Sequence, residues 1–417
     1  MTRKYRRGTS YKVSFPTAPS LTALPAKVEL HQEASSHDIL ILEYPKASSL
    51  WFEVLKTGTP VVFSWTQDNK GYRWVGYVNI VSKQSAAQKQ RTMKVICVGA
   101  SFVLKQKATR TFKNSTVVEA AEKIAKEFGF SFVGDPGSRR FDALSIAGQS
   151  YWEWLQEQAQ RIGYGLVVVN CTMYLRPLDK FIDATSFDVP SYTSEMAGPV
   201  SGANLYDRTL DSFTVLNGDY VEDGFLTTRT ARVSAGVSPA TGKLTTHVSS
   251  PSDSKKKLRG GTSGTLFTAY SDEVVHTKGS AKSSSLAESQ ARRFTVPALI
   301  IGQGDPGVHP LVTVHVQGTG VDTDGYWVVS KVVHSFRIAG DYQTEMRVHS
   351  DGLGGTLPSS LRKTDGHRTN AINLNENVIE ALQADKRVFG TRLISKQPVV
   401  VESQQGFLQL GTVWSGR

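Results

Sequence analysis

The stretch that decides the fold is residues 293–350, RFTVPALIIGQGDPGVHPLVTVHVQGTGVDTDGYWVVSKVVHSFRIAGDYQTEMRVHS. Within it, Val312, Val314 and Val316 alternate with polar residues, which places three β-branched side chains on one face of a strand. Two further strands are predicted at 326–335 and 342–349, with Gly and Asp residues in the connections. The stretch therefore predicts an antiparallel meander with one buried face, a piece of a β-barrel or β-sandwich.

The same pattern occurs earlier in the chain. Residues 60–81 and 310–333 each contain a Pro, an apolar strand, a polar turn, a Gly-Tyr pair and a Val-rich strand. A third strand follows each copy, at 93–98 and at 342–348. We interpret the two segments as copies of one β module; the alternative is that any two meanders look alike. The interpretation predicts that residues 71–81 and 325–334 occupy equivalent strands of two similar barrels.

Several short motifs stand in or just before this block: the predicted helix 286–294 with Ala287 and Ala291, Gly304-Asp-Pro-Gly307, Pro310 with its strand, Gly325-Tyr-Trp-Val-Val329, Val333-His334 and Asp341-Tyr-Gln-Thr344. Together they resemble the central hub proteins of phage tail tips and baseplates, of the late-control-protein-D type. The block is also similar to the hub part of the valine-glycine-repeat spike proteins of type VI secretion. The resemblance covers roughly residues 12–350, and the order and spacing of the motifs carry it.

Length and composition are those of a soluble protein of about three domains. The 417 residues are 39% hydrophobic and 20% charged, and no run approaches the roughly 18 apolar residues of a membrane span. The N-terminus MTRKYRRGTSYKVSF is basic but lacks the apolar core of a signal peptide, so we expect synthesis in the cytoplasm of the host.

The net charge of +11 permits nucleic acid, an anionic surface or an acidic protein as partner. Two basic clusters, at 3–7 and 255–259, lie in polar sequence and are interpreted as solvated segments. The two cysteines, Cys97 and Cys171, are interpreted as small buried hydrophobes, with a disulfide left open. Two cysteines form neither a disulfide framework nor a zinc site.

The predicted fold class is mainly β with an α+β insert: two related antiparallel β-barrel, tube-like domains, a small α/β domain and a C-terminal extension. In the first barrel, strands are predicted at 28–31, 39–42 and 50–55, and Phe63 and Trp65 are assigned to the core. The domains are 1–11 (basic arm), 12–110 (first barrel), 111–180 (insert), 181–350 (second barrel) and 351–417 (extension).

The insert is predicted from two helices that each begin with a capping box. Thr116 with Glu119, and Ser150 with Glu153, form the boxes. Gly129 and Gly163 end the helices, and a hairpin is expected from 165–169 to 173–175. The apolar residues at helical spacing should form one small core, which includes Ile124, Phe128, Trp152 and Leu155.

The second barrel is expected to begin with strands at 211–220 and 226–237. Residues 249–265 are rich in Ser, Gly and Lys and predict a long exposed loop, and a helix is predicted at 285–294. In the C-terminal extension, Asn375 begins a predicted helix over 375–389, and residues 399–402 and 407–413 predict a terminal hairpin.

No set of residues meets the requirements of a catalytic, cofactor or metal site. Residues 302–307 match GxGxxG, but Pro306 and Pro310 argue against the helix that a dinucleotide site needs, so we predict a strand connection. His309 and His315 lack a third metal ligand nearby in sequence, and His334 is interpreted as structural. Glu153 and Glu157 share one helix, whereas glycosidases need carboxylates across a cleft, and Trp152 and Trp154 fit a core better than a sugar platform.

The resemblance implies a non-enzymatic structural hub. It implies a homotrimeric ring whose six barrel-like units join a six-fold tail tube or distal tail protein to a three-fold spike or fibre, in contact with tape measure and other baseplate proteins. DNA would pass through the lumen without specific binding. The alternatives are the hub of a non-phage contractile injection system, a β-barrel nucleic-acid-binding protein that uses residues 70–74, and a cell-wall hydrolase.

Overall fold

The structure is a computed structural model that describes residues 9–351 apart from 20, 22, 35, 46–49, 68–69, 87–88, 138–139, 183–188, 195–207, 217–229, 238–240, 250–266, 271–281, 283–293, 295, 321–322 and 338–340. Several expectations therefore lie outside the described residues. These are most of the basic arm, both basic clusters, the loop 249–265 beyond its first residue, the helix 285–294 before its last residue, and the C-terminal extension beyond Asp351 with its helix and hairpin.

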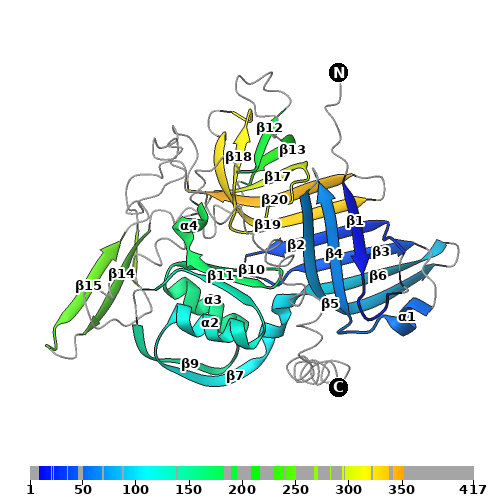
Figure 1. The fold of residues 1–417 in the computed structure, drawn as a ribbon. Coiled ribbons are helices and arrows are strands. Elements are labelled where there is room, and N and C mark those ends of the chain that lie inside the picture. The colour runs from blue at the N-terminus through cyan, green and yellow to red at the C-terminus, as the bar shows by residue number, and fades with distance from the viewer. Residues whose placement is uncertain are drawn as a thin grey trace.

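Twelve strands form one continuous sheet that makes both barrels (Figure 1). The first barrel contains, in spatial order, β1 (Ser10–Ser14), β4 (Pro60–Gln67), β5 (Lys70–Ala86), β6 (Lys89–Gly99), β3 (Ile39–Pro45) and β2 (Lys27–Glu33). The second contains β12 (Ser191–Ser194), β18 (Thr313–Gln317), β19 (Gly325–Arg337), β20 (Tyr342–Ser350), β17 (Val296–Gln303) and β13 (Arg208–Val215). β12 also pairs with β13, which closes the second barrel, and β2 pairs with β19, which joins the barrels.

The two barrels have the same strand order. The first strand named for one barrel corresponds to the first strand named for the other, and so on through all six. The order in which the chain forms these six strands is also the same in both barrels. One difference is that β1 runs antiparallel to β4, whereas β12 runs parallel to β18. The predicted mainly-β architecture with two related barrels is therefore confirmed, and β5 and β19 are its equivalent central strands.

A backbone detail fixes the residue-by-residue correspondence. In the first barrel, the Gly58 N–H donates to the Val78 carbonyl at 2.7 Å, and the Val78 N–H donates to the Thr59 carbonyl at 2.8 Å. In the second barrel, the Leu311 N–H donates to the Val329 carbonyl at 2.7 Å, and the Val329 N–H donates to the Val312 carbonyl at 2.8 Å. Gly58 and Leu311 both have positive φ, 87° and 70°. A β-bulge follows each valine in its pairing with the next strand. Val78 is thus the counterpart of Val329.

This correspondence corrects the alignment read from the sequence. Phe63 lies opposite Trp74, and its counterpart Val316 lies opposite Gly325, so Trp74 corresponds to Gly325. The Gly71–Tyr72 pair is therefore three residues out of register with Gly325–Tyr326. Gly and Tyr recur at strand starts for local turn reasons, whereas the bulge and the left-handed residue determine the true register.

Each barrel has its own apolar core. In the first, Phe63 and Trp65 are buried as predicted, and their rings stack with centroids 5.0 Å apart. The core also includes Phe336 and Tyr342, which come from strands of the second barrel. The second core is built mainly from Val residues, with Trp327 fully buried. Strands of one barrel therefore contribute to the interior of the other.

The insert contains more strands than the sequence indicated. Around α2 (Val117–Glu127) and α3 (Tyr151–Arg161) lie β10 (Tyr164–Val169), β11 (Thr172–Pro177) and β8 (Ser131–Gly134), together with the ribbon β7 (Lys107–Thr116) and β9 (Arg140–Ser150). The ribbon curves past both helices (Figure 1). It follows a 3-10 turn, η1 (Ala100–Lys105), whose Ala100 and Leu104 already belong to the core of the insert.

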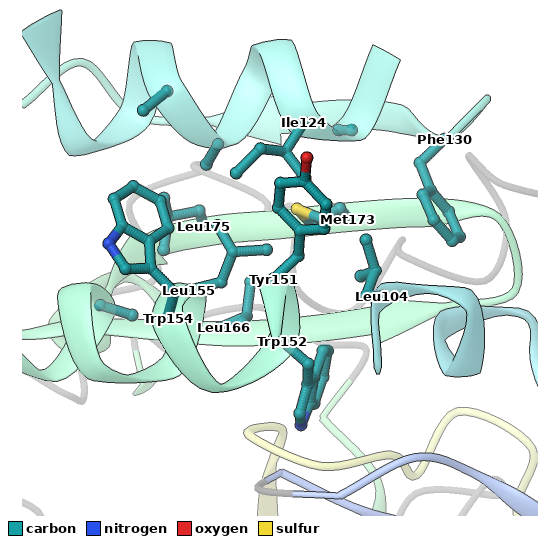
Figure 2. Packing of buried hydrophobic residues seen from close by; sticks show 14 of the residues in the cluster. Leu104, Ile124, Phe130, Tyr151, Trp152, Trp154, Leu155, Leu166, Met173 and Leu175 are labelled. Atoms are coloured by element: carbon teal, nitrogen blue, oxygen red, sulfur yellow. The ribbon is translucent and has the colours of Figure 1, made fainter. Parts of the chain in front are cut away.

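Local signals placed the two helices correctly. Both capping boxes form, and Gly129 and Gly163 adopt φ of 76° and 71° directly after the helix ends. The expected core residues share one cluster, in which Phe128 is half-buried. Figure 2 shows Trp154 beside the inner residues of α2, whereas Trp152 lies on the side of α3 away from α2.

Two sequence expectations are wrong. Of residues 50–55, which were expected to form a strand, 50–54 form a helix, α1 (Leu50–Val54). Trp51 and Leu55 lie one helical turn apart and both pack on the first barrel, with the Trp51 and Tyr44 ring centroids 4.8 Å apart. The strand expected at 226–237 is β14 (Thr230–Val237). It pairs with β15 (Leu244–Ser249) and β16 (Phe267–Tyr270) in a separate sheet, outside the second barrel. A short helix, α4 (Leu178–Ile182), follows β11.

The insert core gives a stability test. Ile124 is 0% exposed, so Ile124→Ala should cost about 2–5 kcal/mol of unfolding free energy through lost burial and a cavity. Phe128→Ala is the matched change at a half-buried position in the same cluster, and we expect a smaller cost there. Urea unfolding of both variants, followed by circular dichroism, makes the comparison. An equal or larger loss for Phe128→Ala would contradict the packing described here.

Candidate functional site

The GxGxxG segment is a strand connection. Gly302 lies in β17, and no helix begins in residues 303–312. The Asp305 carboxylate accepts a hydrogen bond from the Gly307 N–H at 2.8 Å and pairs with Arg208 at 3.0 Å. A Cβ atom at Gly304 would lie 2.2 Å from the ring of Tyr342, which explains the glycine there. The turn is thus fastened to β13 and β20, as a strand connection requires.

The same turn reaches the first barrel. The Gln67 side-chain amide donates to the Gly304 carbonyl at 3.0 Å, across a separation of 237 residues in sequence. Tyr342, against which Gly304 packs, stacks on Phe336 with ring centroids 4.3 Å apart and an interplanar angle of 9°. Phe336 in turn packs edge-on against Phe63 at 5.1 Å. We call this contact region between the barrels the seam.

His334 lies buried at the seam, and its two ring nitrogens have distinct partners. Nε2 lies 3.0 Å from the Val308 carbonyl, which can only accept, so Nε2 carries the proton. Nδ1 therefore accepts from the Tyr342 hydroxyl at 2.9 Å. Burial lowers the pKa of His334 to about 4, in agreement with a neutral ring. The geometry fits a structural histidine.

The other histidines from the sequence analysis are held separately. The His309 ring is buried, with Nδ1 3.1 Å from the Pro310 carbonyl. His315 stacks on Tyr326 with ring centroids 4.6 Å apart. Among the residues that the structure describes, no group of three or more His, Cys, Asp or Glu could hold a metal ion. Cys97 and Cys171 are both buried, free thiols in different cores.

A second polar junction, between the first barrel and the insert, was missed by the sequence analysis. The Asp38 carboxylate accepts from the Gln32 amide at 2.9 Å and the Trp74 indole at 3.1 Å, and burial raises its pKa to about 7. His37 contacts Ser101 Oγ at 3.0 Å and lies 4.6 Å from the Trp152 ring. Burial, and then nearby Lys105, lower the pKa of His37 to about 4. Adjacent His and Asp in a short turn give no signal of burial in sequence.

The residues considered for ligand binding are engaged inside the fold. Trp74 is 1% exposed, so residues 70–74 do not present it as a stacking platform for bases. Trp154 is equally buried and donates its indole N–H to the Ser145 carbonyl at 3.0 Å. Glu153 is held in its capping box, and Glu157 accepts from Gln149 at 3.3 Å. None of the helices in the described part of the chain is both long and apolar enough to cross a membrane.

Comparison with known proteins gives matches at the level of structure. No family model matches the sequence, and no curated protein sequence matches it. The crystal structure of the tail protein from Neisseria meningitidis MC58 aligns over 83% of this chain and 98% of its own, with TM-score 0.57 and 12% identity. The 43 kDa tail protein of prophage MuSo2 from Shewanella oneidensis aligns over 82% and 100%, with TM-score 0.58 and 14% identity.

This chain has the fold of tail proteins. The predicted resemblance is confirmed for the fold, and it extends over nearly the whole of both solved chains. The seam and the junction with the insert therefore lie within a fold that those two proteins share.

Tyr342→Phe tests the assignment of the seam. The change removes the donor to Nδ1 of His334 and leaves a buried acceptor without its partner, at a cost of about 1–3 kcal/mol. Tyr326→Phe is the matched control, because Tyr326 is half-buried and its ring contact with His315 is retained, so we expect a change within about 0.5 kcal/mol. Chemical unfolding of both variants gives the comparison. Equal stability of the two variants would overturn the assigned hydrogen bond.

Stability should depend on pH through Asp38 and the two buried histidines in opposite directions. Burial raises the pKa of Asp38 from 3.8 to about 7 in the folded state, so its contribution to stability falls as pH rises between these values. Burial lowers the pKa of His37 and of His334 from 6.5 to about 4, so their contribution to stability falls as pH drops between these values. The two effects partly cancel in mildly acidic solution.

Asp38→Asn separates the two effects, because its amide oxygen can still accept from Gln32 and Trp74. We expect the variant to be more stable than the wild type near pH 8, by on the order of 3 kcal/mol, and to lose stability more steeply on acidification. His37→Gln should instead flatten the acid loss. Unfolding curves across this pH range test both, and a less stable Asp38→Asn variant near pH 8 would count against the raised pKa of Asp38.

Proposed function

We propose that this protein is the structural hub of a phage tail tip or baseplate, and that it acts without catalysis. In the proposal three copies form a ring, which joins the six-fold tail tube to a three-fold spike or fibre and surrounds the channel for DNA. The observation that carries the proposal is the pair of barrels with one strand order in one continuous sheet. Three such chains supply six similar units, which suits a protein between six-fold and three-fold partners.

The proposed partners follow from this position. The tail tube or a distal tail protein would bind on one side, and a spike or fibre protein on the other, with the tape measure protein and other baseplate proteins nearby. The protein would be made in the host cytoplasm and reside at the tail tip. The fold shared with two tail proteins over more than four-fifths of this chain supports this placement.

The alternative functions have weaker support. The hub of a non-phage contractile injection system has the same architectural requirements, and an effector gene rather than a capsid gene beside the coding sequence would favour it. A nucleic-acid-binding barrel needs exposed aromatic side chains among basic ones, but Trp74 is buried. A cell-wall hydrolase needs carboxylates across a cleft, whereas Glu153 serves a helix terminus.

The proposal predicts assembly and specific co-purification. Light scattering of the purified chain should give a mass of about 137 kDa, three times the 45.6 kDa chain. Co-expression with the tail-tube and spike proteins encoded beside it should yield a complex of all three. A monomer that binds neither protein would overturn the proposal, as would clearing of a peptidoglycan suspension by the purified chain. Tight, salt-dependent DNA binding would instead favour the nucleic-acid alternative.

A further inference from the structure

The strands that join the two barrels have counterparts in the same chain that do not pair with each other. β2 pairs with β19 from Lys27 opposite Arg337 to Glu33 opposite Lys331. By the shared strand order, β13 is the counterpart of β2, and β5 is the counterpart of β19. Each chain therefore makes this contact once within itself, between β2 and β19. It also carries one further strand of each kind, β13 and β5.

The second half of β5 has a free edge where β19 contacts β2. β4 pairs with this edge of β5 up to Tyr77, and β6 occupies the opposite edge. β19 is divided in the same way, since β18 pairs with it up to Val328 and β2 takes over the same edge from Lys331. Among the strands that the structure describes, none takes over that edge of β5.

The outer edge of β13 is free in the corresponding place. β12 pairs with β13 up to Leu210, and no described strand pairs with this edge from there to Val215. Register makes Phe213 and Val215 the counterparts of Val28 and Leu30, through their shared partners on the next strand.

Burial differs between these counterparts in the way that a missing neighbour predicts. Val28 and Leu30, which β19 covers, are 0% and 1% exposed. Phe213 and Val215 pack on the second core but remain partly exposed. An added strand along β13 would cover them, as β19 covers β2. An unpaired edge beside apolar side chains is a ready template for another strand.

We propose that β13 of one copy pairs antiparallel with the second half of β5 in the next copy, which repeats between chains the contact that β2 makes with β19 within one chain. The proposal rests on the proposed ring, because its occupant is a second copy of this chain. Every copy carries one free edge of each kind, one on each barrel, so the contact is head-to-tail. Repetition of the rotation that relates the two barrels of one chain generates the ring.

The internal contact also supplies the register. Within one chain, Glu29 lies opposite Ser335. Thr214 is the counterpart of Glu29 and Gln84 is the counterpart of Ser335, so Thr214 should lie opposite Gln84 of the next copy. Leu30 lies opposite His334, so Val215 should lie opposite Lys83.

Paired cysteines test this register. Thr214→Cys combined with Gln84→Cys places two thiols at directly opposed positions of neighbouring copies, roughly 4.5–5.5 Å apart between Cβ atoms. After mild oxidation with diamide, we expect most of the chain in covalent dimers and trimers on a non-reducing gel. Native Cys97 and Cys171 are buried and are kept in every variant as a constant background.

Three controls make the result specific. Each single variant should give little crosslinking. Thr214→Cys with Lys83→Cys should give little, because adjacent residues of a strand point to opposite faces. Glu29→Cys with Ser335→Cys should crosslink within one chain and leave it monomeric on the gel. The reduced variants should elute like the wild type.

The outcomes separate this contact from the proposed function. A trimer in light scattering that does not crosslink through Thr214 and Gln84 would overturn the strand assignment and leave the ring standing. Equal crosslinking in the Lys83 control would overturn the register and with it the copied contact. A monomer that binds neither tail-tube nor spike protein would overturn both proposals.

Discussion

The rest of the structure depends on the pairing of β19 with two different strands along one edge. β18 occupies the first part of this edge, and β2 occupies the remainder, while β20 pairs along the opposite edge. The change of partner coincides with the bulge after Val329, which alters the course of the strand. One strand thereby closes the second barrel and extends the first. Phe336 and Tyr342 fill the first core for this reason.

Buried polar side chains make specific hydrogen bonds at both contact regions. Gln67 of the first barrel donates to the Gly304 carbonyl of the second barrel at the seam, and His37 of the first barrel contacts Ser101 Oγ in the turn η1 beside the insert. Such groups add little net stability, but an alternative packing would leave them without partners, at a cost of about 1–3 kcal/mol each. We infer that they favour one relative placement of barrel and barrel, and of barrel and insert, over sliding alternatives.

Signals that act over a few residues were readable from the sequence. The capping boxes at Thr116 and Ser150 determine where both helices begin, and alternation identified most strands of the meanders. The burial of Asp38 was not readable, because it depends on Gln32 and Trp74 from other strands. The position of β14 was missed for the same reason, since its partners β15 and β16 determine which sheet it joins. The ribbon of β7 and β9 joins segments separated by α2 and β8, so no turn motif announces it.

The two barrels share a backbone plan but differ in chemistry on their outer faces. At three counterpart positions on adjacent strands, the first barrel has Ile80, Ile96 and Ile41, and Ile80 is 50% exposed. The second barrel has Lys331, Arg347 and Leu299 at the same positions. In the proposed ring, the barrel backbone would repeat six times. The apolar row of Ile80, Ile96 and Ile41 and the basic row that contains Lys331 and Arg347 would alternate, so each row would repeat three times. A six-fold partner can therefore match the shared backbone plan, and a three-fold partner can recognise one row in every second unit, which a ring of six identical barrels would not permit.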